Sequence, residues 1–160
     1  MSHFRVERTV PSPPEEVWRR LTDWPAHGRQ VPLTRTRVLT PGPNRAGTRF
    51  TARTGIGRLS FDDPMEVVHW EPPAQGRTGA CRLEKSGRVV RGWALVEVSG
   101  AGDGSRVVWT EELSVRGVPR VFDPALARAG RFLFGRAVDG LLREGRRAAP
   151  GDGGPRSPGR

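Results

Sequence analysis

The sequence contains few of the residues that support cross-linking, metal binding or covalent catalysis. Among its 160 residues there is one cysteine, Cys81, and there is no tyrosine. A single cysteine excludes an intrachain disulfide and a cysteine-based zinc cluster, and the absence of tyrosine excludes acid catalysis by a phenol. The three histidines are widely separated, and neither a P-loop nor a G-x-G-x-x-G fingerprint occurs. We therefore predict no metal site and no cofactor.

Long hydrophobic runs are absent as well. The first ten residues show no signal-peptide pattern, and no stretch approaches membrane-spanning length, so we expect a cytoplasmic protein. The length suits one domain, which we place at residues 1–149. Residues 150–160 are rich in proline and glycine and offer no apolar side chain to bury, which predicts a disordered tail.

The charge is strongly one-sided. The net charge is +10, and Lys85 is the only lysine in a chain otherwise rich in arginine. Such a balance could indicate an anionic partner, either nucleic acid or a membrane surface. The arginines are scattered, however, and no aromatic-interleaved basic motif or zinc finger is present. This pattern favours a compositional bias over nucleic-acid binding, and peripheral contact with a membrane stays an alternative.

Residues 118–149 contain the only long amphipathic pattern. Asp123 followed by Pro124 is typical of a helix N-terminus. Apolar residues then recur at steps of three or four, which places them on one helix face. They are Phe122, Leu126, Ala129, Leu133, Ala137 and Leu141, widened by Phe132, Val138 and Leu142. A stripe this wide must be covered by the rest of the chain.

The rest of the chain predicts strands and two short helices. Residues 3–10 alternate as a strand, and a capping box at Ser12–Glu15 starts a helix that ends near Thr22. A helical turn follows at 25–29. Later strands are predicted at 33–39, 48–54, 58–70, 78–85, 89–98 and 106–115, with a bulge at Pro64. The expected α+β fold is a curved seven-stranded antiparallel sheet wrapped around the C-terminal helix.

Four short patterns resemble those of the START-like (SRPBCC) superfamily, which includes bacterial polyketide cyclases/dehydrases and lipid-transfer proteins. They are SPPEEVW at 12–18, LTDWP at 21–25, AGTRF at 46–50 and GSRVVWT at 104–110. With the closing helix, the resemblance covers residues 3–146. It implies a helix-grip fold with a deep, mostly apolar cavity for lipids, polyketides or aromatic metabolites. The superfamily has no shared catalytic motif to carry across.

Strand alternation nominates two ionisable groups for this cavity. Glu111 shares the inward parity of Trp109, and a carboxylate in an apolar cavity suits acid–base work. Pairing of Glu111 with an arginine is the favoured alternative. His69 follows Val67 in step and could act as a base, although a structural hydrogen-bonded histidine is commoner. The neighbours Asp62 and Asp63 should point to opposite faces and form no dyad.

The same alternation, with the helix stripe, gives a predicted ligand-binding set. Its members are Phe50, Val67, Cys81, Leu83, Trp109, Leu113, Phe132 and Leu133. The leading hypothesis is binding of a hydrophobic small molecule between the sheet and the C-terminal helix. The alternative is a polyketide cyclase, aromatase or dehydratase that uses Glu111 and His69 as its acid–base pair. The sequence does not decide whether the protein is an enzyme, and it leaves the oligomeric state open.

Overall fold

The computed structural model of the protein describes residues 1–147, with side chains up to Arg143. The predicted tail at 150–160 lies outside the described residues. The elements are β1 (Ser2–Val10), α1 (Pro14–Leu21), α2 (Trp24–Gln30), β2 (Thr34–Val38), β3 (Arg49–Ile56), β4 (Leu59–Glu71), β5 (Gly79–Ser86), β6 (Val90–Ala101), β7 (Gly104–Val115), the 3-10 turn η1 (Arg120–Phe122) and α3 (Asp123–Arg147).

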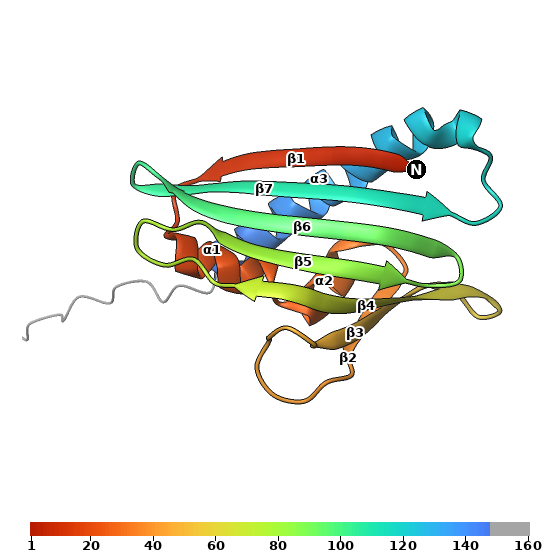
Figure 1. Cartoon of the computed structure of the whole chain (residues 1–160), viewed down its shortest axis with the longest axis horizontal. Coiled ribbons are helices and arrows are strands. Elements are labelled where there is room, and N and C mark those ends of the chain that lie inside the picture. Colours follow the sequence, from red (N-terminus) through yellow and green to blue (C-terminus); the bar gives the residue numbers. More distant parts are fainter. Residues whose placement is uncertain (148–160) are drawn as a thin grey trace, which may run out of the picture.

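The strands form one antiparallel sheet in the order β1-β7-β6-β5-β4-β3-β2. The three helices lie on one side of it, with α3 running behind β1, β7 and β6 (Figure 1). This is the predicted helix-grip fold. None of the described helices is long and apolar enough to cross a membrane.

The bulge expected at Pro64 does not occur, and the irregularity of β4 lies four residues later, at Val68. Pro64 pairs in register with Thr51 of β3, and the ladder with β5 begins only at the next residue. Proline is tolerated there because no β5 residue is paired with it. The register shift comes instead between Val67 and His69. Beyond that point, the side chains of β4 exchange faces.

The starts of the two short helices differ from the prediction. The expected capping box at Ser12 does not form: Pro13 is the N-cap of α1, and no side chain caps it. The Ser12 carbonyl instead accepts a hydrogen bond from the Ser105 hydroxyl at 2.6 Å. The cap of α2 is made by Asp23, whose carboxylate accepts from the Ala26 backbone N–H at 3.2 Å.

The predicted apolar stripe of α3 is right in its second half and wrong in its first. Ala137, Val138, Leu141 and Leu142 are buried in the core. Phe132, however, is 68% exposed, and Phe122 is exposed as well. The inward face runs instead through Gly130 and Phe134. A Cβ on Gly130 would lie 2.6 Å from the ring of Phe4, so the bare backbone there lets α3 approach β1 and fixes its rotation.

Candidate functional site

A cavity of about 110 Å³ lies between the sheet and the helices α2 and α3. Its walls combine aromatic, aliphatic and polar side chains, and they come from α2, β2–β7, α3 and the residue after α2. The lining residues are Trp24, His27, Val31, Thr34, Thr36, Phe50, Ala52, Thr54, Asp63, Met65, Leu83, Lys85, Ala94, Trp109, Phe134 and Ala137. Three members of the predicted ligand-binding set, Phe50, Leu83 and Trp109, are among them.

Aromatic rings form a continuous series along the cavity. Trp24 and Phe50 stack with ring centroids 4.6 Å apart and planes 8° from parallel. His27 lies 5.5 Å from Trp24 and 5.6 Å from Trp109, and Phe134 continues the series 5.9 Å beyond Trp109. Rings at these separations present flat, weakly polar faces that suit a flat apolar ligand.

The histidine in this series is held neutral. Burial lowers the pKa of His27, and the ammonium of Lys85 contributes in the same direction. The backbone carbonyl of Leu21 lies 2.7 Å from Nε2. Because a carbonyl can only accept, Nε2 carries the proton and Nδ1 is left as an acceptor. The ring can therefore accept a proton or a hydrogen bond without first losing one.

A buried ion cluster forms the polar wall of the cavity. The ammonium of Lys85 lies 3.1 Å from Asp63 Oδ2 and 3.1 Å from Glu111 Oε1, and the Lys85 side chain is only 6% exposed. The second oxygen of Glu111 accepts a hydrogen bond from the Trp109 indole at 3.0 Å. Burial alone would lower the pKa of Lys85, but Glu111 and Asp63 outweigh it and the pKa is raised. The lysine is therefore an ion-pair partner and not a free amine nucleophile.

Small residues on β6 let this cluster cross the sheet. Lys85 is on β5 and Glu111 is on β7, so β6 lies between them. Gly92 is the β6 partner of Lys85, and Ala94 is the β6 partner of Glu111. A larger side chain in place of Ala94 would stand between the ammonium and the carboxylate, because neighbouring residues in register share a face of the sheet. At Gly92 an added Cβ would collide with the backbone of β7.

Sequence reasoning missed Lys85 as part of the site, and it placed Asp63 on the inward face only if Pro64 inserts no bulge. Cys81 and Leu83 were expected to face inward, and Lys85 has the same parity, so the only lysine of the chain was already marked by the alternation. Asp63 faces inward because Pro64 inserts no bulge. Its neighbour Asp62 points outward and contacts Arg53 at 3.4 Å. The prediction that these two carboxylates form no dyad is confirmed.

His69 does not lie in the cavity. The bulge between Val67 and His69 turns it outward, where its imidazole is 53% exposed and lies 3.7 Å from the carboxylate of Glu71. Trp70 takes the inward position and packs against Trp18, with ring centroids 5.0 Å apart. The sequence alternation failed here because it carried no sign of where the extra residue would fall.

The other members of the predicted set lie around the cavity without lining it. Val67 and Cys81 are fully buried in the core, and Leu113 packs against it. Burial raises the pKa of the Cys81 thiol to about 12, so it behaves as a small hydrophobe, as expected. Leu133 is partly buried and Phe132 points to solvent; Phe134 is the aromatic that α3 contributes. Glu111 is fully buried behind Lys85.

Comparison with known proteins places the chain in a family. The family described as "Polyketide cyclase / dehydrase and lipid transport" matches residues 1–145. The chain belongs to this family. A search of curated proteins found no match. Membership shows a fold shared by cyclases, dehydrases and lipid-transport proteins, and it leaves open which of these activities the present chain has.

Solved structures with the same fold come from several bacteria. The protein TTHA0849 of Thermus thermophilus is 19% identical with a TM-score of 0.70, covering 92% of this chain and 99% of its own. An aromatase/cyclase of Streptomyces sp. R1128 is 15% identical with a TM-score of 0.64, covering 95% and 98%. A STAR-related lipid transfer protein fragment of Xanthomonas axonopodis is 16% identical with a TM-score of 0.69, covering 90% and 85%. At these identities the likeness concerns the fold alone.

Proposed function

We propose that this family member binds a small hydrophobic molecule in the cavity between the sheet and α3. The single observation that supports this most is the cavity flanked by Trp24, Phe50, Trp109 and Phe134. Burial of an apolar ligand there would remove its surface from water at roughly 25 cal/mol per Å². The aromatic walls lie on several different elements, so the site is formed by the fold as a whole.

A larger hollow on the surface supports this assignment less well. It measures about 950 Å³ and lies between β1 and α3, where it opens to solvent. Arginines on both elements flank it, among them Arg5, Arg128 and Arg131. Its polar rim is suited to ions and water, whereas the smaller, aromatic-lined cavity is suited to an apolar molecule.

The positions of Glu111 and His69 do not support the catalytic alternative that uses them as a pair. A cyclase or dehydratase that uses Glu111 and His69 needs both groups within reach of one substrate. Glu111 is fully buried in an ion cluster, and His69 is on the outer face of β4. This arrangement does not favour a mechanism in which the two residues act together on one substrate.

The test uses one variant that fills the cavity and one that does not. Ala137 lines the cavity from α3, while Ala129, two turns earlier on the same helix, is exposed. With toluene as the probe, calorimetric titration and thermal unfolding should detect binding to the wild type and to Ala129→Leu. Ala137→Leu should lose it. At ten times Kd the ligand should add about 1.4 kcal/mol to the free energy of unfolding.

Two results would overturn the proposal. One is an absence of toluene binding by the wild type at any accessible concentration. The other is equal binding by wild type and Ala137→Leu, which would place the toluene elsewhere on the protein.

A further inference from the structure

One carboxylate oxygen in the cavity wall is left without a partner. Asp63 is 8% exposed, and its Oδ2 accepts a hydrogen bond from Lys85 at 3.1 Å. Its Oδ1 is buried and finds no hydrogen-bond donor among the described residues. A buried acceptor without a donor costs about 1–3 kcal/mol, and more when it is charged, so such atoms are rare unless something else binds them.

The charge balance of the cluster also favours a hydrogen-bond donor as the missing partner. Two carboxyl groups, Asp63 and Glu111, share the single ammonium of Lys85, so acidic groups outnumber basic ones by one. Glu111 Oε1 has no hydrogen-bond donor either, but it forms an ion pair with Lys85, and Oε2 accepts from the indole of Trp109. Asp63 Oδ1 has no donor among the described residues. Asp63 lines the cavity, so the cluster places a buried acceptor at the cavity wall that attracts a donor or a positive charge.

The size and walls of the cavity limit the rest of the ligand. A dry cavity of about 150 Å³ is enough for one benzene ring, and the present one measures about 110 Å³. Flat faces from Phe50, Trp109 and Phe134 surround it. One ring therefore fits with small side-chain adjustments, whereas a lipid chain or a fused polyketide would require the cavity to open much further.

We infer that the cavity recognises a single aromatic ring bearing a hydroxyl or amino group, and that this group donates a hydrogen bond to Asp63 Oδ1. This inference rests on the proposed function and adds a ligand class to it. Asp63 supplies polar specificity, and the aromatic walls supply affinity that does not depend on the polar group. Lys85, which also lines the cavity, holds the carboxylate in place through Oδ2 and is itself paired with Glu111.

The experiment compares three ring ligands that differ in one substituent: phenol, anisole and toluene. In a purely apolar cavity phenol should bind most weakly of the three, because its hydroxyl would be buried without a hydrogen-bond partner. A hydrogen bond to a charged acceptor is worth about 1.5–3 kcal/mol, which is roughly a 10- to 150-fold change in Kd. The wild type should therefore prefer phenol to anisole, which has the oxygen but no proton to donate. Aniline, whose amino group can also donate, should likewise bind more tightly than anisole.

The variant Asp63→Leu tests the acceptor directly. It leaves Lys85 paired with Glu111, so the charges still balance, and continued toluene binding reports an intact cavity. Its preference for phenol over toluene should fall by at least tenfold. Asp63→Asn, which keeps an acceptor oxygen but loses the charge, should lie between. Asp62→Leu, the neighbour on the outer face, should match the wild type.

The outcomes separate the two proposals. If the wild type binds neither toluene nor phenol, the proposed function itself fails. If it binds both, and Asp63→Leu leaves the preference unchanged, only the role of Asp63 is overturned. An equal preference for anisole and phenol in the wild type would also overturn it, because anisole cannot donate.

Discussion

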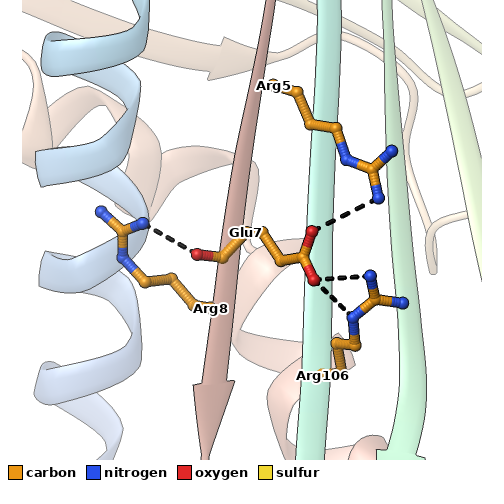
Figure 2. Close-up of polar contacts among 4 residues, drawn as sticks. All are labelled: Arg5, Glu7, Arg8 and Arg106. Carbon is orange, nitrogen blue, oxygen red and sulfur yellow. Dashed lines mark hydrogen bonds and ion pairs between the residues drawn. The ribbon is translucent and has the colours of Figure 1, made fainter.

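Two ion clusters lie on opposite faces of the same sheet and serve different ends. On the outer face, the carboxylate of Glu7 on β1 is clasped by the guanidinium groups of Arg5 and Arg106, while Arg8 binds the Glu7 backbone carbonyl (Figure 2). On the inner face, Lys85 holds Asp63 and Glu111 behind the cavity. The outer cluster is open to solvent, so water can take the place of a lost partner there. The inner cluster is buried, so water cannot do so.

The basic residue also differs between the two clusters. On the outer face the hydrogen bond from Arg106 lowers the pKa of Glu7, and water still reaches the carboxylate. Exposed pairs of this kind contribute little to stability because the solvent screens them. The inner cluster uses a lysine, whose compact ammonium can sit between two carboxylates. The only lysine of the chain is thus at a position where the compact shape of its ammonium group and the burial of its side chain both matter.

The strongest test of this contrast is Lys85→Met. The change leaves two buried carboxylates without their cation, so the free energy of unfolding should fall by about 3–5 kcal/mol. Urea denaturation followed by tryptophan fluorescence measures it. The matched outer variant, Glu7→Gln, should leave the midpoint almost unchanged. Equal losses in the two variants would show that the inner cluster is not more critical than the outer one.

A triple variant separates the cost of an unpaired charge from the value of the cluster. Lys85→Met, Asp63→Asn and Glu111→Gln together remove all three charges and keep an acceptor for the Trp109 indole. At least half of the loss from Lys85→Met should be recovered, since buried ion pairs can often be replaced by neutral side chains at little cost. No recovery would mean that the ion pairs themselves stabilise the fold.

The next largest effect concerns the bare backbone over which the inner cluster crosses β6. Gly92 has φ +149°, and a Cβ there would lie 1.9 Å from the carbonyl oxygen of Glu112. Gly92→Ala should therefore cost about 1–3 kcal/mol through backbone strain. Gly57 also has a positive φ but has open space around it, so Gly57→Ala is the control and should cost less. If the two variants lost similar amounts of stability, the positive φ alone would explain the loss and the contact with Glu112 would not matter.

The sequence was sufficient for the architecture because that depends on repeated signals. Alternating strands, glycine and proline turns and one long amphipathic stretch each involve many residues, so a local error does not change the fold. Single positions depend on details that such patterns omit. The pattern of apolar residues along α3 took no account of Gly130, whose lack of a side chain sets the rotation of the helix. The prediction therefore placed Phe132 at the cavity, where the structure has Phe134.

The site was partly predictable for the same reason. Parity correctly placed Phe50, Leu83 and Trp109 on the cavity wall and Glu111 inside. It failed at His69 because one extra residue in β4 reverses every side chain beyond it. It also could not show that Asp63, Lys85 and Glu111 meet, since their cluster spans the four strands β4 to β7 and depends on how these strands pair.

The smallest predicted effect compares the two histidines that the fold separates, His27 inside and His69 outside. Burial lowers the pKa of His27 below its ordinary value of 6.5 in the folded state. Between these two pKa values the unfolded chain binds more protons, so the free energy of unfolding rises with pH and falls as the pH drops below about 6.5. His27→Gln, which keeps a donor for the Leu21 carbonyl, should flatten this slope between about pH 6.5 and 5, where few carboxylates titrate. His69→Gln is the matched substitution on the outer face, where the side chain is 53% exposed. Urea midpoints measured across this range decide the matter. An unchanged slope in His27→Gln would mean that burial does not hinder protonation of this ring, and the inner face would not be dry at this residue.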